Sequence, residues 1–251
     1  MKSTSYVTFI LIIFFIFKSI SFYGQADPNQ KSYYKWFDNI MGVGNIGLYD
    51  GVEYREEYRT INDSHQFYLS SKFIFGNMVY DGQPYYDVEM KYNIFNDAVI
   101  VKIPDLYGHI AIQLISEKIE SFSINNLLFI RLSPEDKETI SKDNSGFYEI
   151  SFQSNHLTLL KKHIKIKKAM VDKEFLYHTF KDKNEHFIYA NNSFHKIKSK
   201  KDVLKLFPAQ KKSISAFYNF NRKIFKLNID QFMIRLAKHI NDLMNNNTTA
   251  P

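Results

Sequence analysis

The chain has 251 residues, 33 of them basic and 26 acidic, and it contains no cysteine, so its formal net charge is +7. This length can bury a substantial core, and a content of 45% apolar and 24% charged residues is that of a globular protein. The absence of cysteine excludes a disulfide scaffold, thiolate metal sites, a cysteine nucleophile and a lipid-modified cysteine anchor.

Residues 1–26 have the layout of a secretory signal peptide. Lys2 is followed by nine uninterrupted apolar residues, Phe9–Phe17, and small residues precede a cleavage point after Ala26. A membrane-spanning helix needs roughly 20 apolar residues, and Lys18 interrupts this run early. We therefore predict cleavage after Ala26, with an uncleaved anchor as the alternative. The mature protein is expected to be exported and to act in the periplasm, at the outer membrane or outside the cell.

The segment after the predicted signal peptide combines a helical pattern with a glycine-rich turn. Apolar residues between Tyr33 and Met41 have helical spacing, which predicts a short amphipathic helix ending at Gly42. Residues 42–47 match G-x-G-x-x-G, but a dinucleotide-binding loop joins a strand to a helix, and no apolar strand precedes this one. We interpret the glycines as a turn and expect no small-molecule cofactor.

From about residue 48 to 198 the pattern is that of short β-strands. Apolar or alternating runs are separated by Asp-Gly, Asn-Asp and Asn-Asn turns, and no helical pattern lies between them, which favours an antiparallel meander over a parallel sheet. A YDGxxY sequence occurs at Tyr49–Tyr54 and again at Tyr80–Tyr85, and we interpret it as a hairpin turn used twice. The expected strands are Lys72–Tyr80, Tyr85–Ile94, Ala98–Ile103, His109–Leu114, Ile119–Ile124, Leu127–Leu132, Gly146–Phe152, Leu157–Lys167, Phe175–Phe180 and His186–Ala190.

Near residue 199 the apolar period changes from two to 3.6. Ser199 and Asp202 have the spacing of a capping box, Pro208 predicts a break, and Asn228 is placed to cap a last helix. The apolar residues from Ile229 to Met244 form a single stripe, which is expected to pack on the β domain.

The expected fold class is α+β and β-rich: an antiparallel meander, in the form of a curled sheet, sandwich or open barrel, with carboxy-terminal helices packed on it. The expected organisation is a signal peptide at 1–26, a β-rich domain at 27–198, a helical segment at 199–244 and a disordered tail at 245–251.

The sequence contains no recognisable catalytic motif. There is no G-x-S-x-G, S-x-x-K, H-E-x-x-H or P-loop sequence, and no two of the eight histidines have i, i+2 or i, i+4 spacing. We therefore assign no catalytic, metal-binding or cofactor-binding residue. A secreted hydrolase without a recognisable motif stays open as an alternative, because catalytic groups can converge from distant positions.

One strand carries a candidate basic binding face. His163, Lys165 and Lys167 alternate with Ile164 and Ile166, so the three basic residues should share one side of the strand. They can form a cationic strip for phosphate, lipid headgroups or an acidic partner. The alternative is a solvated face, or an edge strand that lysines protect from aberrant pairing.

Charge is divided unevenly along the chain. Residues 27–154 contain 11 basic and 19 acidic side chains, whereas residues 155–251 contain 20 and 7. The complementary charges can hold the two parts together, or the basic part can face an anionic surface. Only five of the 33 basic residues are arginines, the side chain that nucleic-acid recognition favours, so we expect no nucleic-acid partner.

Four segments of the chain carry a resemblance to known proteins: the signal segment, the YDGxxY region, the FYEISF strand at Phe147–Phe152, and the SKKDVLKLFP sequence from Ser199 to Pro208 with its lysine-rich continuation. Together they resemble a group of uncharacterised exported proteins from Bacteroidota. The resemblance implies an envelope location and no particular activity or site residue. We expect an exported envelope accessory or binding protein with an envelope protein as its partner, possible roles being outer-membrane assembly or transport. The second alternative is a binder of anionic lipid or polysaccharide through the basic carboxy-terminal half.

Overall fold

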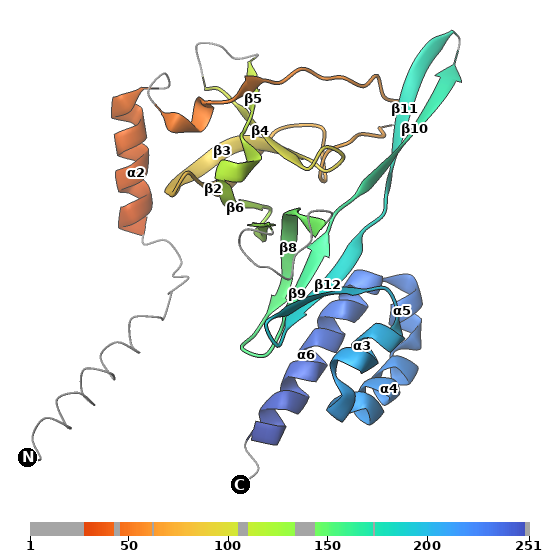
Figure 1. Cartoon of the computed structure of the whole chain (residues 1–251). Helices are drawn as coiled ribbons and strands as arrows, with labels where there is room; N and C mark the ends of the chain where they lie inside the picture. The colour runs from red at the N-terminus through yellow and green to blue at the C-terminus, as the bar shows by residue number, and fades with distance from the viewer. Residues whose placement is uncertain are drawn as a thin grey trace, which may run out of the picture.

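The structure is a computed structural model that describes residues 28–42, 46–61, 63–104, 110–133, 144–172 and 174–248. Within these ranges the chain forms one large antiparallel sheet and a separate two-stranded hairpin, with helices packed at the carboxy-terminal end (Figure 1). This arrangement confirms the expected β-rich α+β fold class. The predicted signal peptide lies outside the described residues.

The secondary structure follows the expected order along the chain. The strands are β1 (Val52–Glu53), β2 (Ile74–Tyr80), β3 (Gln83–Asn93), β4 (Ala98–Lys102), β5 (Ala111–Gln113), β6 (Ile119–Ile124), β7 (Leu127–Leu132), β8 (Gly146–Gln153), β9 (Thr158–Lys162), β10 (Lys165–Asp172), β11 (Phe175–Asp182), β12 (Glu185–Ala190) and β13 (Ser193–Ile197). The helices are α2 (Pro28–Met41), α3 (Lys200–Leu206), α4 (Lys211–Phe220), α5 (Arg222–Leu227) and α6 (Ile229–Thr248), with 3₁₀ turns η3 (Gly47–Tyr49), η4 (Ser116–Lys118) and η6 (Pro208–Gln210).

The large sheet is mostly a meander. Across the described ranges its strand order is β1-β5-β4-β3-β2-β6-β7-β8-β9-β12-β13, and most neighbours follow one another in the chain. Three neighbour pairs are not consecutive in the chain: β1 with β5, β2 with β6, and β9 with β12. The chain returns through η4 after β5 to place β6 beside β2, and β10 and β11 are inserted between β9 and β12. The sheet does not close on itself: β1 and β13 form its two edges, and β10 and β11 leave it as a separate hairpin.

The two YDGxxY sequences have different structures. The copy at Tyr80–Tyr85 forms the β2–β3 hairpin, with its Asp-Gly pair at positive φ as such turns require. The copy at Tyr49–Tyr54 is not a hairpin, because it enters β1, which pairs with the distant strand β5. Gly51 allows the chain before β1 to lie close to β5, since a Cβ atom at this position would lie 2.5 Å from the carbonyl oxygen of Gln113. The prediction of a turn used twice is therefore wrong for the first copy.

The first apolar core lies on one face of β2–β7 and contains a group of packed aromatic rings. The rings of Phe122 and Phe129 stack with their centroids 4.8 Å apart, and Tyr92 packs edge-on against both. Each of these side chains is at most 1% exposed. Because a buried aromatic side chain removes about 150–250 Å² from water, this packing gives the many Phe and Tyr residues a structural role.

Asp97 connects this first core to β8 and β9. Its carboxylate accepts hydrogen bonds from the Tyr92 hydroxyl at 2.6 Å and from the Phe147 amide at 3.3 Å, and the Lys162 ammonium lies 3.4 Å away. Gly146 passes directly beside this carboxylate with φ at +118°, a conformation that disfavours any side chain. Since three partners hold the carboxylate in place, it cannot easily move aside for a Cβ atom at Gly146.

The second core joins the carboxy-terminal helices to β8, β9 and β12. Helix α6 contributes its apolar stripe, as predicted, and the stripe packs with Leu159 and Ile188 of the sheet. The most deeply buried residues of the stripe are Phe232, Met233, Leu236, Ala237 and Ile240.

The predicted helix signals occupy the expected places. The amide of Ser199 donates to the Asp202 carboxylate at 2.8 Å, and the side-chain oxygen of Asn228 accepts from the Gln231 amide at 2.9 Å. Pro208 begins η6, between α3 and α4.

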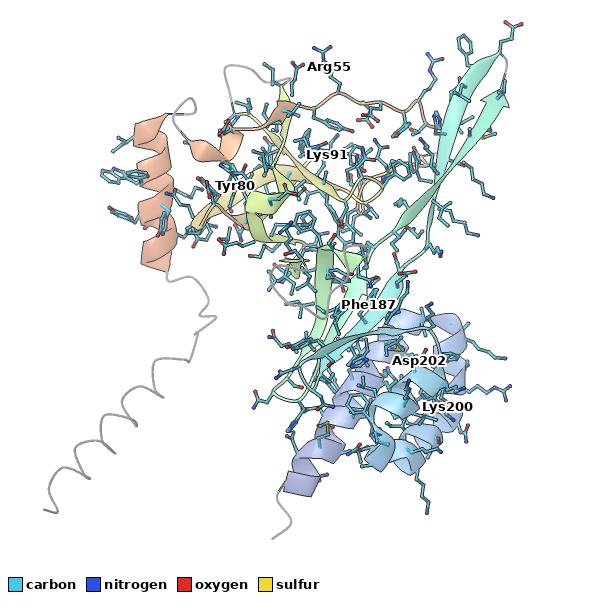
Figure 2. The ribbon with its side chains drawn as sticks, in the orientation of Figure 1. Arg55, Tyr80, Lys91, Phe187, Lys200 and Asp202 are labelled. Carbon is cyan, nitrogen blue, oxygen red and sulfur yellow. The ribbon has the colours of Figure 1, made fainter. Side chains whose placement is uncertain are left out.

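A smaller cluster lies on the opposite face of the same strands. Leu132, Tyr148, Leu160 and Phe187 are buried together, and Phe194 of β13 stacks on Phe187 with centroids 4.8 Å apart. Phe187 lies on β12, between the β10–β11 hairpin and the helices (Figure 2). These strands therefore bury apolar side chains on both faces.

Several predicted boundaries need correction. Helix α6 continues to Thr248, and the side chain of Asn245 lies 2.9 Å from His156 Nε2, so the disordered tail predicted from Asn245 is wrong for residues 245–248. Residues 249–251 are outside the described ranges. The predicted strand Leu157–Lys167 is divided between β9 and β10, and β13 was not predicted because its side chains mix polar and apolar character without clear alternation.

We predict that Gly146→Ala lowers the free energy of unfolding by about 2 kcal/mol or more. The substitution adds the strain of a side chain at positive φ, about 1–2 kcal/mol, to the displacement of the Asp97 carboxylate. Urea denaturation followed by circular dichroism measures this loss.

Gly82→Ala is the matched control, because Gly82 also has positive φ, at +76°, but no atom lies within 4 Å of an added Cβ. The control should lose only the backbone contribution. An equal loss in the two variants would contradict the role assigned to Asp97.

Candidate functional site

The predicted basic face is engaged within the chain. His163 is buried, with Nε2 at 2.7 Å from Glu149, and Lys165 lies 3.5 Å from Asp182. The Lys167 ammonium lies over the ring of Tyr58, 4.2 Å from its centroid. The predicted alternation is present, but the lysine side of β10 faces inward at this point, and Ile166 on the other side is 43% exposed.

A row of ionisable side chains crosses β8, β9 and β12 between the two large cores. Glu149 is directly opposite Lys161, and Lys161 is directly opposite His186, so the three side chains share one face of the sheet. All three are buried, as is His163. We call Glu149, Lys161, His163, His186 and Asp230 the polar row.

Asp230 joins the polar row from the first turn of α6. Its two carboxylate oxygens lie 2.6 Å from Lys161 Nζ and 2.9 Å from His186 Nε2. The Lys161 side chain is only 11% exposed, so its positive charge needs the compensating carboxylate of Asp230. The polar row therefore fixes the position of α6 relative to β9 and β12.

The electrostatic environment favours the ionised carboxylates. The hydrogen bond with His186 and the ammonium of Lys161 hold the pKa of Asp230 well below its usual range, although partial burial opposes this. Burial disfavours ionisation of Glu149, but His163 and the Lys161 charge outweigh it and hold the pKa of Glu149 below its usual value. Both carboxylates therefore act as counterions to the basic members of the polar row.

A serine–histidine pair occurs elsewhere, between α4 and α6. Ser213 Oγ lies 3.0 Å from His239 Nε2, and the His239 ring stacks on Phe217. A catalytic pair needs a third group that orients the base and a pocket for substrate. Among the described residues no carboxylate bonds to His239, and neither member lines the two pockets described below. This pair is best explained as a hydrogen bond between helices.

Two surface pockets differ in how their charges are compensated. The first, about 350 Å³, lies beside α2, η3 and β3, and its charges are paired: Lys35 with Asp87, and Lys102 with Glu89. The second, about 530 Å³, lies between the start of β12, the end of β13 and the carboxy-terminal helices. It is lined by Lys183, Lys196, Lys198 and Lys200, and Glu185 is the one acidic residue among its described lining residues. We call it the basic pocket.

The β10–β11 hairpin, which we call the arm, projects from the sheet (Figure 1). Val171 and Leu176 face each other across its strands near the tip and are 73% and 55% exposed. On the other face Met170 is opposite Tyr177, and Phe175 at the end of the arm is 54% exposed. The tip therefore exposes apolar side chains on both faces, and on the second face the Arg59 guanidinium lies 4.8 Å from the centroid of the Phe175 ring.

Helix α2 forms a second apolar surface. Lys31 and Lys35 contact the Asp87 carboxylate at 2.9 and 2.8 Å, so the helix turns polar side chains toward the sheet. Its outward side carries four large, exposed side chains: Tyr33, Trp36, Phe37 and Ile40. In Figure 1, α2 and the arm lie on opposite sides of the large sheet.

No protein-family model, curated protein or solved structure matches this chain. In the described part of the chain, no group of three or more His, Asp or Glu side chains is arranged to hold a metal ion. Nor does any described helix have the length and apolar character needed to cross a membrane.

Sequence reasoning identified His163 but missed the other members of the polar row. Glu149, Lys161 and His186 are separated in sequence and meet only through the strand register. Asp230 follows the predicted cap Asn228 and looked like an ordinary acidic residue in a first helical turn. Three lysines of the basic pocket, Lys196, Lys198 and Lys200, lie next to the predicted capping box, but Lys183 precedes β12 and β13, so no local sequence pattern groups the four.

We predict that Asp230→Asn lowers the free energy of unfolding at pH 7 by about 2 kcal/mol, because it leaves Lys161 and His186 without their carboxylate partner. Since the folded-state pKa of Asp230 lies below its unfolded value of 3.8, its contribution is present above about pH 4 and is lost as the pH falls through the folded pKa. The difference from the wild type should therefore shrink in urea titrations carried out at progressively lower pH below 4.

Asp242→Asn on the same helix is the control, because Asp242 is exposed and forms no ion pair with any described residue. It should change stability by less than about 0.5 kcal/mol. An Asp230→Asn protein as stable as this control at pH 7 would show that the polar row does not hold α6.

Proposed function

We propose that this chain is an exported binding protein of the cell envelope that holds a protein partner at the tip of the arm. The observation that carries the proposal is the projecting hairpin whose tip exposes large apolar side chains on both faces. Exposed apolar surface of this kind is unfavourable in water and is typical of interaction sites. The signal-peptide layout of residues 1–26 supports export.

The arm is held in a defined direction before any partner binds. It continues the β9–β12 pair, and the Lys183 amide donates to the Ile164 carbonyl at 2.9 Å where the two pairs meet. Along β11, the amide of His178 donates to the Arg59 carbonyl at 2.8 Å, and the Phe180 amide donates to Ser64 Oγ at 2.6 Å. Such preorganisation lowers the entropy that binding must remove.

The chemistry of the tip favours a protein groove over a lipid bilayer. The hairpin exposes apolar side chains on both faces, Val171 and Leu176 on one and Met170 on the other. A groove in a partner protein can bury both faces between its two apolar walls. The backbone groups at the outer edge of β10, which pairs with no described strand other than β11, would lack hydrogen-bond partners in the hydrocarbon of a bilayer. The outer edge of β10 is free of a neighbouring strand among the described residues, so a partner strand can also add there.

A photoreactive amino acid at Val171, in the full chain expressed in the cells that produce it, tests the proposal. We expect a discrete covalent adduct with one envelope protein. Leu176→Ser, which alters the side chain opposite Val171, should reduce adduct formation by at least tenfold, because burial of a Leu side chain contributes about 1.5–3 kcal/mol.

Phe220→Ser is the matched control, because Phe220 is a 91% exposed apolar side chain on α4. It should leave the adduct unchanged, and both variants should keep the wild-type melting temperature. Equal adduct formation with Leu176→Ser, or labelling of phospholipid in place of a protein, would overturn the proposal.

A further inference from the structure

We propose that the basic pocket binds an anionic amphiphile, a carboxylate or phosphate attached to a single acyl chain. Its volume of about 530 Å³ lies within the range of about 300–1,000 Å³ that is typical of small-molecule sites. The pocket is formed by the β11–β12 junction, by the β13–α3 junction and by α4, α5 and α6. It is thus a junction between the sheet and the helices, a common place for ligand sites.

The charges around the pocket are not balanced within the chain. Lys196 is paired with Glu185 at 2.5 Å, whereas Lys183, Lys198 and Lys200 have no acidic partner within 4 Å among the described residues. The lining therefore has an excess of three positive charges with histidine neutral. Clustered ammonium groups repel one another, and an anion placed between them relieves that repulsion.

Two acids border the lining without cancelling its charge. The Asp202 carboxylate accepts hydrogen bonds from the amides of Lys198 and Ser199 and interacts with the charge of Lys198, which leaves an excess of two positive charges. Asp230 is one residue from the pocket residue Ile229, but its two oxygens already contact Lys161 and His186. Its negative charge is therefore compensated by the polar row. The Lys200 ammonium also lies over the ring of Tyr218, 5.4 Å from its centroid. Figure 2 shows Lys200 at the start of α3, at the helical end of the molecule.

The other side of the pocket is apolar. Tyr218, Phe225, Ile229 and Met233 line it from the helices, and Phe225 and Ile229 are 39% and 41% exposed. A free inorganic anion would leave Phe225 and Ile229 in water. An acyl chain covers them while its charged head remains with the lysines, so the combination selects an amphiphile.

Calorimetric titration of the full mature chain with four probes tests the proposal: myristate, tetradecyl phosphate, tetradecanol and inorganic phosphate. We expect the two charged amphiphiles to bind at least tenfold more tightly than either tetradecanol or inorganic phosphate. Vesicles of phosphatidylcholine containing phosphatidylglycerol, examined by flotation, separate a free amphiphile from a membrane headgroup as the source of the anion. Free amphiphile should bind, and the protein should stay unbound to vesicles.

Two charge-reversal variants identify the site. Lys198→Glu combined with Lys200→Glu should weaken myristate binding at least tenfold. Lys211→Glu combined with Lys212→Glu makes the same change in charge at exposed positions of α4 outside the pocket lining, and it should have little effect. Circular dichroism melting shows that both proteins are folded.

Equal weakening in the two double variants, unchanged binding in the pocket variant, or binding of inorganic phosphate as tight as that of tetradecyl phosphate would overturn the proposal. Binding to vesicles without binding of free amphiphile would also overturn it. None of these results depends on the arm, so the outcome is separate from that of the photo-cross-linking experiment.

Discussion

The burial of opposite charges between two apolar cores constrains the rest of this structure. Lys161 is placed between Glu149 and His186 by the strand register, and Asp230 approaches it from α6. A buried ammonium without a carboxylate partner is strongly destabilising, so α6 has one favourable position on the sheet. Two contacts join the acidic part of the sequence, residues 27–154, to the basic part, residues 155–251: Asp97 with Lys162 and Glu149 with His163. Hydrophobic burial supplies the driving force, and the polar row specifies the alignment.

The arm and the basic pocket both depend on the long hairpin that contains β9 and β12. Its proximal part belongs to the large sheet, its distal part is the arm, and the junction Lys183–His186 lines the basic pocket. The polar row fixes the proximal part against α6, so the direction of the arm and the shape of the pocket are set by the same contacts. The arm presents apolar side chains and the pocket presents lysines, so they suit partners of different chemistry.

Local features of this fold were readable from the sequence, whereas contacts between distant segments were not. The strands Ile119–Ile124 and Leu127–Leu132 have the predicted limits, and Asn228 caps α6 as expected, because turn and cap chemistry acts over a few residues. The alternation of Lys165 and Ile166 was also visible. Which side faces inward depends on Tyr58, more than a hundred residues earlier, and the meeting of Asp230 with Lys161 depends on how α6 packs. Neither can be derived from local periodicity.

A double-mutant cycle between Glu149→Gln and Asp230→Asn tests the central claim most directly, because the two carboxylates interact with the same buried ammonium. If the polar row acts as one unit, removing either carboxylate leaves the other as the main group that compensates the charge of Lys161. The loss of the second carboxylate then costs more than it does in the wild type. The free energies of unfolding at pH 7 should then be non-additive by about 1 kcal/mol, within the range seen for shared networks. Additivity to within about 0.3 kcal/mol would contradict the claim that these residues jointly align the helices with the sheet.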